Sequence, residues 1–148
     1  MRLLLQRVSR AEVRAGGAVV GSVGPGLAIL LGVGPADDAA LTQAMARRVT
    51  ELRIFEDADG RTNRSLVESG GEVLVVSQFT LYADLRRGRR PGFGGAATPD
   101  LAERLYGQFI AALRELGITV ASGRFGAEMD VELVNRGPFT IWLDSEDR

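Results

Sequence analysis

The chain has 148 residues, 45% of them hydrophobic and 25% charged, which predicts one globular domain spanning 1–148 that buries a core without disulfides or a metal. It contains no Cys and no His, and all 18 basic residues are Arg, so thiolate catalysis, Cys/His zinc sites and lysine Schiff bases are excluded. The net charge of −1 provides no general attraction to nucleic acid, so any RNA contact must come from a local basic cluster.

The first third of the chain predicts three strands. Leu3–Val13 alternates apolar and polar residues, and Gly16-Gly17 turns the chain into a second strand, Ala18–Val23, which predicts a β-hairpin. Leu27–Val33 is apolar on both faces and too short for a helix, as expected of a strand in the middle of a sheet. No apolar run reaches the roughly 18 residues that a membrane span requires. We therefore expect a cytoplasmic protein without membrane contacts.

The middle of the chain predicts a helix, a strand and an exposed loop. Asp38–Leu52 has apolar residues at near-helical spacing, and the acids at its beginning favour a helix start. Asp57–Gly60 is a turn signal, and Val73–Val76 is a second fully apolar strand. Leu85–Ala97 is rich in Arg and Gly and shows no periodicity, which predicts an exposed loop.

The last third of the chain predicts a second helix and three more strands. Thr98 as N-cap and Pro99 at the first helical position begin a helix that Gly117 ends. The residues predicted to share its buried face are Leu101, Leu105, Phe109, Ala112 and Leu116. The strands are expected at Ile118–Ala121, Met129–Val134 and Phe139–Leu143. The fold class is therefore α/β in the broad sense (α+β), with mixed, curved, barrel-like β-sheets and two helices packed on one side.

Polar groups directly follow the strand Val73–Val76, in the segment Ser77-Gln78-Phe79-Thr80. One interpretation is structural: the strand surfaces into a turn, and Phe79 packs in the core. The other is catalytic, because hydroxyls and an amide at the end of a buried strand can act as a nucleophile or as oxyanion donors. A Ser or Thr nucleophile normally needs an adjacent base, and this chain has no His or Lys to serve as one.

A second polar segment, Asn135–Thr140, contains Gly137 and Pro138 between two predicted strands. The structural interpretation is a hairpin turn, because Gly and Pro are common between strands. The functional interpretation is a ligand contact, because a Gly without Cβ followed by Pro makes a rigid wedge of backbone. Neither segment alone decides between structure and function.

Together, the two segments resemble the two signature motifs of the D-aminoacyl-tRNA deacylase family, also called D-tyrosyl-tRNA deacylases. The resemblance covers essentially the whole chain. Further stretches that carry it are Gln6-Arg7-Val8, Leu30–Val33, Arg53-Ile54-Phe55, Asn63, Asp84, Arg90-Pro91, Gly123–Ala127 and Met129.

This resemblance implies a homodimer with two active sites at the subunit interface, in which the Gly-cisPro segment of one subunit, Gly137 and Pro138, enters the pocket of the other. The carbonyls of this segment would occupy the space that the side chain of an L-amino acid needs, so D-amino acids and glycine fit and L-amino acids do not. The implied reaction is hydrolysis of D-aminoacyl-tRNA and of mischarged glycyl-tRNA, a chiral proofreading step in translation. Neither a cofactor nor a metal is implied.

The resemblance also implies roles for individual side chains. The catalytic pocket would contain Ser77, Gln78, Phe79 and Thr80, and the Gly-Pro segment would be supported by Arg7, Asn135 and Thr140. The 3′-terminal adenosine would be contacted by Phe125 and Met129, and tRNA phosphates by Arg86, Arg87, Arg89 and Arg90. The structural alternatives are a surface position for Arg7, core packing of Phe125 and Met129, and a solvated arginine loop.

Two mechanisms remain open at this point. Thr80 could be the nucleophile, with Asp84 as the only neighbouring carboxylate base. Alternatively, the ribose 2′-hydroxyl of the terminal adenosine could position the attacking water while backbone donors stabilise the oxyanion, which suits a chain without His, Lys or Cys. Two other functions are compatible with the sequence: a related deacylase with relaxed chirality that acts on some L-aminoacyl-tRNAs, and a non-catalytic RNA-binding dimer.

Overall fold

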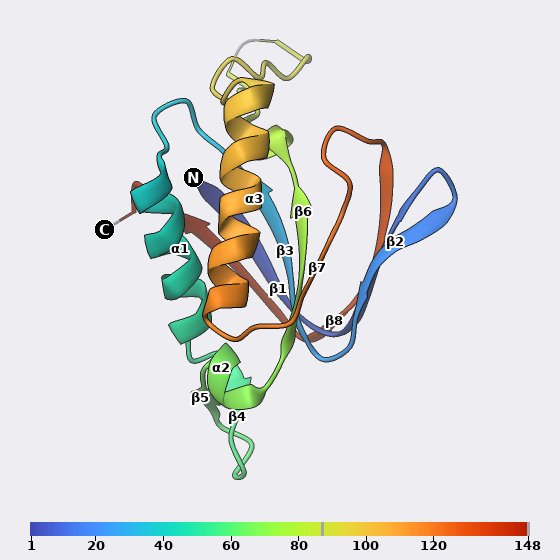
Figure 1. Ribbon diagram of the computed structural model, residues 1–148, viewed down its shortest axis with the longest axis vertical. Coiled ribbons are helices and arrows are strands. Elements are labelled where there is room, and N and C mark those ends of the chain that lie inside the picture. The colour runs from blue at the N-terminus through green and yellow to red at the C-terminus, as the bar shows by residue number, and fades with distance from the viewer. Residues whose placement is uncertain (87, 148) are drawn as a thin grey trace.

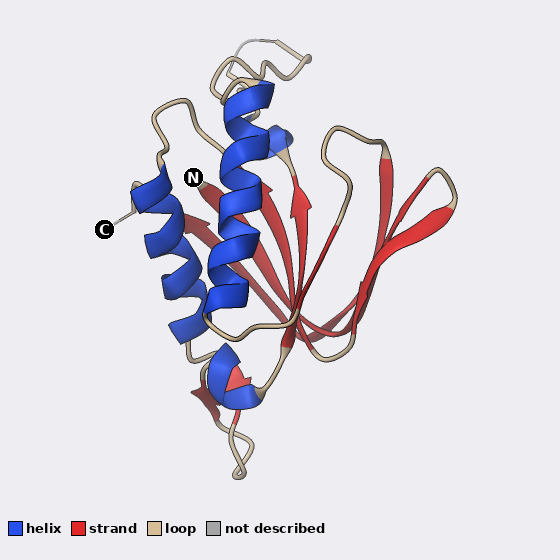
Figure 2. Ribbon diagram, in the orientation of Figure 1, coloured by secondary structure: helices blue, strands red, loops and turns tan. Residues whose placement is uncertain are grey.

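One strongly curved β-sheet carries two long helices on one face in the computed structural model, which describes residues 1–86 and 88–147 (Figure 1). Figure 2 shows the helices lying side by side in front of the sheet. In chain order the elements are β1 (Arg2–Ala15), β2 (Ala18–Val23), β3 (Gly26–Gly32), α1 (Ala39–Glu51), β4 (Phe55–Glu56), β5 (Thr62–Arg64), α2 (Leu66–Ser69), β6 (Glu72–Ser77), the 3₁₀ helix η1 (Phe79–Tyr82), α3 (Pro99–Glu115), β7 (Val120–Ser122) and β8 (Met129–Asp144).

The main sheet is mixed, with the order β2-β1-β3-β6-β7 and with β8 paired along β1. β1 pairs antiparallel with β3, β2 and β8, whereas β3 with β6 and β6 with β7 are parallel. The two ends of this path approach each other, since a Cβ built on Gly21 of β2 would lie 2.7 Å from the carbonyl oxygen of Ser122 in β7. The sheet is therefore nearly closed, and the predicted curved, barrel-like α/β class is confirmed.

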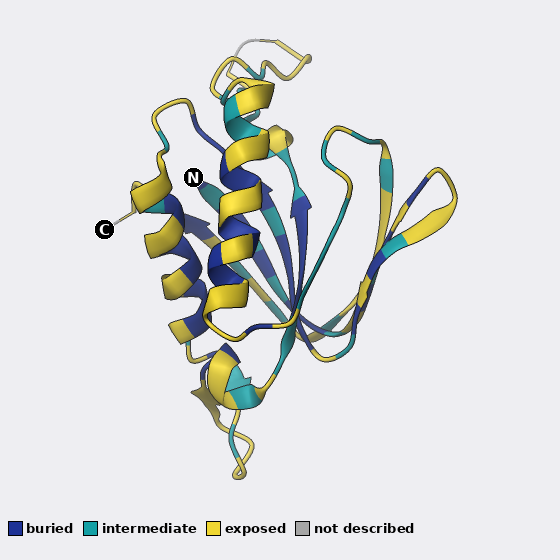
Figure 3. Ribbon diagram, in the orientation of Figure 1, coloured by how far each residue is buried: buried dark blue, intermediate teal, exposed yellow. Residues whose placement is uncertain are grey.

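The core divides into two apolar clusters along β1. Leu3 and Leu5, in its first half, belong to the cluster beneath α1 and α3, and Val8 and Val13 belong to a second cluster on the opposite side of the sheet path. The pairing of β1 with β8 shifts register between Gln6 and Arg10, and such irregularities bend a strand and increase its twist. Figure 3 shows the buried residues where the helices face the sheet.

Local sequence signals explain most element boundaries. Gly16 and Gly17 have φ of 59° and 78° and join β1 to β2, as the predicted hairpin requires. The carboxylate of Asp38 accepts from the N–H of Leu41 and caps α1. The structure also contains the short helix α2, which the sequence analysis did not predict, although Ser65 and Glu68 form a capping box there.

The predictions for α3 need two corrections. Thr98 is the N-cap residue, but its side chain makes no capping hydrogen bond, so Pro99 and the acidic first turn mark this start without it. Leu116 does not lie on the buried face: it is exposed at the C-cap, and Leu113 is buried instead. Gly117 has φ of 83° and follows the end of the helix, as predicted.

The C-terminal segment differs most from its prediction. Met129–Val134 and Phe139–Leu143 are parts of a single strand, β8, which pairs with β1 on both sides of Asn135–Thr140. Because both parts run in the same direction along β1, the hairpin-turn interpretation of Gly137-Pro138 is wrong. Gln6 pairs with Thr140 and Val8 pairs with Asn135, so a step of two residues along β1 corresponds to a step of five residues along β8. The extra residues of β8 form a bulge.

None of the helices that the structure describes is long and apolar enough to cross a membrane.

Candidate active site

A cavity of about 550 Å³ opens where β3 and β6 end, between the first half of α3 and the segment that leads into β8. Its walls are mainly apolar, because strand ends, a helix face and aromatic rings meet there. Of the predicted site residues, it is lined by Ser77, Gln78, Phe79, Phe125 and Met129. The structure thus brings three residues of the predicted catalytic segment together with the two predicted adenosine contacts, which lie far apart in the sequence.

The predicted catalytic segment turns sharply at the end of β6. Ser77 is the last residue of the strand, and the N–H of Gln78 donates to the carbonyl of Leu31 at 2.7 Å before η1 begins. The side-chain amide of Gln78 donates to the hydroxyl of Thr80. Thr80 is not among the residues that line the cavity, so its hydroxyl serves as the acceptor of this bond beside the pocket.

Phe79 is not a core residue, which makes the structural interpretation of this segment wrong for that side chain. It is 57% exposed, and its ring meets that of Phe93 edge-on with centroids 5.0 Å apart. Phe93 also lines the cavity. An exposed aromatic ring at the mouth of an apolar pocket is suited to contact a bound ligand rather than to stabilise the fold.

No acidic or basic side chain is among the residues that line this cavity, within the part of the chain that the structure describes. Tyr106 is the titratable residue of the lining, and its hydroxyl donates to the carbonyl of Val75 at 2.8 Å. Burial raises the pKa of Tyr106 above its ordinary value. Its hydroxyl therefore stays protonated at neutral pH and cannot act as the base.

Asp84, the nearest carboxylate in sequence to Thr80, is engaged elsewhere. Arg86 donates to it from Nε and Nη2, both at 2.8 Å, and from its backbone N–H. The Arg86 side-chain hydrogen bonds hold the pKa of Asp84 well below its usual range, which makes the carboxylate a weak base. Within residues 1–86 and 88–147, no cluster of His, Cys, Asp or Glu could hold a metal ion.

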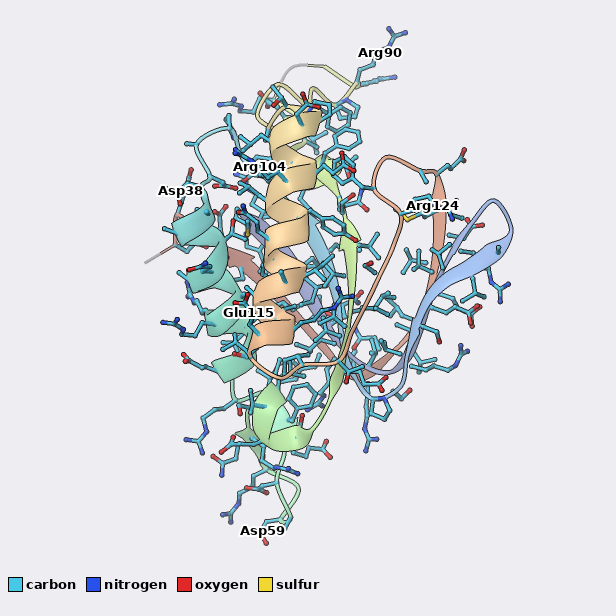
Figure 4. The ribbon with its side chains drawn as sticks, in the orientation of Figure 1. Asp38, Asp59, Arg90, Arg104, Glu115 and Arg124 are labelled. Carbon is cyan, nitrogen blue, oxygen red and sulfur yellow. The ribbon has the colours of Figure 1, made fainter. Side chains whose placement is uncertain are left out.

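The predicted adenosine contacts, Phe125 and Met129, lie in the segment that leads into β8 and line the same cavity as Ser77, Gln78 and Phe79. The Phe125 ring packs against Tyr106 with centroids 5.9 Å apart, and the Met129 sulfur accepts from the N–H of Arg124 at 3.3 Å. Figure 4 shows Arg124 in this segment, at the entrance to β8. Both predicted side chains are half-buried and face the cavity, so neither is a simple core residue.

The Gly-Pro segment forms the bulge of β8. The Gly137-Pro138 peptide bond is cis, Gly137 has φ of 125°, and both residues are exposed. Neither residue lines the cavity of its own chain. The structure therefore separates the two signature segments within one subunit.

Arg7 holds this bulge in place through contacts of its side chain. It is only 7% exposed, which rules out the surface alternative. Its guanidinium donates to the carbonyls of Arg136 at 3.2 Å and Ile54 at 2.8 Å, and it lies 4.8 Å from the centre of the Phe139 ring. A buried cation thus connects the bulge of β8 to the segment that follows α1.

Asn135 closes the base of the bulge. Its Oδ1 accepts from the N–H of Phe139 at 2.8 Å, and its Nδ2 donates to the hydroxyl of Thr140 at 2.7 Å. Thr140 also accepts from the side chain of Gln6 at 3.3 Å. The three predicted supporting residues, Arg7, Asn135 and Thr140, therefore all contact the bulge or its base.

The arginine cluster lies on the loop between η1 and α3, at the same end of the molecule as the pocket. Asp84 and Gly92 exchange backbone hydrogen bonds at 2.7 and 2.9 Å and close the base of this loop. Arg86 pairs with Asp84, whereas Arg89 and Arg90 are exposed, with Arg90 projecting outward in Figure 4. Arg87 lies outside the residues that the structure describes.

Two aromatic residues of the cavity wall, Phe93 and Tyr106, were not predicted from the sequence. Phe93 lies in a loop without periodicity, so no sequence signal marked it. Tyr106 follows Leu105 on the buried side of α3, and a helical projection that included it would have placed a hydroxyl in the core. A buried Tyr hydroxyl needs a partner, which is a usable signal for a residue at a cavity wall.

Comparisons with known proteins identify the family of this chain. A family model described as D-Tyr-tRNA(Tyr) deacylase matches residues 4–144. The D-aminoacyl-tRNA deacylase of Symbiobacterium thermophilum is 58% identical, covering 99% of this chain and 97% of that protein. That of Deinococcus radiodurans is 54% identical, covering 97% and 99%.

Among solved structures, one described as c-Myc DNA Unwinding Element Binding Protein has a TM-score of 0.91 and 36% identity, covering 97% of this chain and 98% of that one. Another, described as a probable eukaryotic D-amino acid tRNA deacylase, has a TM-score of 0.85 at 18% identity and supports the fold alone. The match to the family model, the identities above 50% over nearly the whole length and the shared fold agree, and the chain belongs to the D-aminoacyl-tRNA deacylase family of hydrolases.

Proposed function

We propose that this chain hydrolyses the ester bond between a D-amino acid, or glycine, and the 3′-terminal adenosine of tRNA in the cytoplasm, releasing the free amino acid and the tRNA. The observation that carries the proposal is an apolar cavity of about 550 Å³ that is lined by Ser77, Gln78 and Phe79 and has no charged side chain among its described lining. Such a pocket suits a compact ligand with few polar groups and offers no protein base.

The pocket holds the aminoacyl-adenosine end of the substrate. Phe125 and Met129 provide apolar contact for the adenine, because both line the cavity. Ser77, Gln78 and Phe79 contact the aminoacyl group. Arg86, Arg89 and Arg90, together with Arg87, contact tRNA phosphates from the loop beside the pocket.

The chiral filter comes from a second copy of the chain. Gly137 and Pro138 are exposed, and they line no part of their own pocket. A rigid exposed wedge acts only if it enters a pocket, so the functional unit is a homodimer with each bulge in the partner's site. The exposed Trp142 of β8 supplies apolar surface for the contact, whereas Phe139 and Ile141 are half-buried and pack against the chain's own core.

Because the filter consists of backbone carbonyls, it acts on all amino acids regardless of their side chain. The carbonyls of Gly137 and Pro138 exclude any side chain on the L face of the α-carbon, while a D side chain points away and glycine has none. Arg7 keeps these carbonyls in place through its bonds to Arg136 and Ile54.

The substrate's own 2′-hydroxyl takes the place of a catalytic base of the protein. Backbone N–H groups at the start of η1, those of Phe79 and Thr80, have no partner within the helix and are available for the ester oxyanion. The 2′-hydroxyl of the terminal ribose positions the attacking water, since Tyr106 stays protonated and Asp84 is held by Arg86. Thr80 contributes as an acceptor for Gln78 rather than as the nucleophile.

A release assay tests this proposal. Tyrosyl-tRNA charged with D- or L-tyrosine, and glycyl-tRNA, are each incubated with the protein, and free amino acid is measured over time. The proposal expects release from the D- and glycyl-substrates only. Release of L-tyrosine at a similar rate would identify the relaxed deacylase, and binding without release from any substrate would identify the non-catalytic RNA-binding dimer.

A further inference from the structure

The catalytic turn is fixed at its far end by Arg2, a residue that none of the roles above uses. Arg2 is the first residue of β1, and its Nη1 donates to the carbonyl of Leu81 in η1 at 3.1 Å. Its Nε donates to Asp144, at the end of β8, at 2.9 Å. One guanidinium therefore joins the first strand, the last strand and the turn that carries Gln78, Phe79 and Thr80.

Tyr82, the last residue of η1, is held between Arg2 and two glycines. The guanidinium carbon of Arg2 lies 4.4 Å from the ring centre, within the range of a cation–π contact. The ring also packs closely on β3 and the residues after it: a Cβ on Gly32 would lie 3.2 Å from the ring, and one on Gly34 would lie 2.7 Å from the hydroxyl. The two glycines thus leave room for this ring and for nothing larger.

A turn of four residues depends on such anchors. At its start, η1 is attached to β3 by the bond from Gln78 to Leu31. Its own hydrogen bonds are few, because a single 3₁₀ turn leaves most of its terminal groups without internal partners. The direction in which Phe79 and the backbone donors face the pocket is therefore set by the anchor at each end, and Arg2 with Tyr82 forms the second one.

We propose that Arg2 is a positioning residue for the catalytic turn, acting through the Leu81 carbonyl and the Tyr82 ring. The proposal rests on the proposed function, since it assumes that this turn binds the reacting ester. Arg2 does not touch the pocket, so it acts on turnover by fixing η1 and not by binding substrate. Lysine cannot replace it, because only the planar guanidinium donates in two directions while lying over a ring.

Arg2→Met tests the proposal, with Arg10→Met as the matched control on the same strand. Arg10 forms an exposed ion pair with Glu132 and contacts neither η1 nor the pocket. For D-tyrosyl-tRNA we expect Arg2→Met to lower kcat on the order of 10- to 100-fold, as small misplacements of catalytic groups do, with KM nearly unchanged. Arg10→Met should leave both constants close to wild type, because exposed ion pairs contribute little.

Guanidinium ion added at a concentration below that which unfolds the protein supplies the second measurement. It should restore part of the kcat of Arg2→Met and have no such effect on Arg10→Met, while Arg2→Lys remains impaired. Unchanged kcat in Arg2→Met would overturn the proposal. So would a loss of kcat that follows the loss of thermal stability and that guanidinium does not reverse, because that result assigns Arg2 to the fold alone.

Tyr82→Leu keeps the test decisive if Arg2→Met does not fold. This variant removes the ring and leaves the Arg2–Asp144 ion pair, so the fold keeps its connection between β1 and β8. We expect a lower kcat at nearly unchanged KM, and wild-type kcat would overturn the proposal. A wild-type protein that releases no D-tyrosine would overturn the proposed function itself, whereas an active wild type with an unaffected Tyr82→Leu overturns only this inference.

Discussion

The pocket and the bulge of β8 are built in opposite ways. The pocket has apolar walls, no charged side chain among its described lining and a tyrosine whose pKa is raised by burial. The bulge is exposed and consists of backbone, and it is held by the buried cation Arg7 and by the side-chain hydrogen bonds of Asn135. One region is a cavity, and the other is an exposed backbone bulge.

This difference shows how a chain without His, Cys or Lys divides its work. Under the proposed function, chemistry in the pocket depends on the positions of backbone donors and on groups that the substrate brings. Selectivity would depend on the position of two carbonyls in the bulge, and the buried Arg7 lies beside them. Substitutions in the two regions should therefore have different effects: those in the pocket should lower turnover alone, and those in the bulge should also change selectivity or stability.

The largest effect should come from the substrate and not from the protein. A D-tyrosyl-tRNA ending in 2′-deoxyadenosine, charged on its 3′-hydroxyl, should be hydrolysed on the order of 10² to 10⁴ times more slowly, the usual cost of losing a positioned catalytic group. Thr80→Ala should keep much of the activity. Single-turnover release rates decide, and a dead Thr80→Ala with a fully active deoxy substrate would show covalent catalysis by threonine.

Arg7→Met should produce the largest loss of stability. It leaves the carbonyls of Ile54 and Arg136 without their buried donor, and we expect the free energy of unfolding to fall by about 3 kcal/mol. The bulge should also become mobile, so release of L-tyrosine should rise relative to that of D-tyrosine. Urea denaturation and the release assay measure the two effects, with the exposed Arg10→Met as control. Intact selectivity in a folded Arg7→Met would separate Arg7 from the filter.

Gly137→Ala should harm selectivity and turnover more than the fold. Gly137 has φ of 125°, and an added Cβ would lie 2.9 Å from Nη2 of Arg7, so we expect a loss of about 1–2 kcal/mol in stability from backbone strain. Gly94→Ala is the control, because a Cβ there meets no atom within 4 Å. Thermal melting and D-tyrosine release are compared, and equal proportional losses in both would indicate a purely structural role.

Mixing subunits tests whether the bulge and the pocket of one active site come from different chains. Gly137→Ala carries a damaged bulge and an intact pocket, and Phe79→Ala carries the reverse. When the two impaired variants are refolded together, mixed dimers contain one site with both parts intact, so part of the D-selective activity should return. If the mixture stays as impaired as its components, the bulge does not act across subunits.

The smallest effect is expected at Asp84. Asp84→Asn should leave turnover within a few-fold of wild type, because Arg86 already holds the pKa of this carboxyl low and keeps it from acting as a base. A lowered folded-state pKa stabilises the protein above the ordinary carboxyl pKa and loses that stabilisation as pH falls through the lowered value. The difference in melting temperature between wild type and Asp84→Asn should therefore be constant from pH 8 to pH 5 and shrink in stronger acid.

Strands and helices with strong periodicity could be predicted from the sequence. β3 and β6 are apolar on both faces because they lie inside the sheet, and Gly117 ends α3 where expected. The continuity of β8 could not be predicted, because apolar alternation stops at the bulge and only pairing with β1, more than a hundred residues earlier in the sequence, holds the two parts in line. The order of the strands in the sheet could not be predicted from local sequence signals either.

The site was predictable in its motifs and not in its assembly. Ser77 and Gln78 were recognisable as polar residues at a strand end, and the Gly-Pro pair as an unusual backbone. The placement of Phe93 depends on a loop that is closed by the bridge between Asp84 and Gly92, and the burial of Arg7 depends on two carbonyls from distant segments. Contacts of this kind belong to tertiary structure, and no window of sequence contains them.

The pairing of β1 with β8 has a consequence for how the chain is made. β1 leaves the ribosome long before its partner strand β8, which also carries the bulge. Until β8 arrives, one edge of β1 has no neighbour, Arg7 has no Arg136 carbonyl, and the wall of the pocket that contains Met129 does not exist. Non-local pairing of this kind is slow and leaves apolar edges exposed in the nascent chain. A ribosome that stalls before β8 is translated therefore holds a chain with neither a finished pocket nor a filter, and such a chain is a natural client for chaperones.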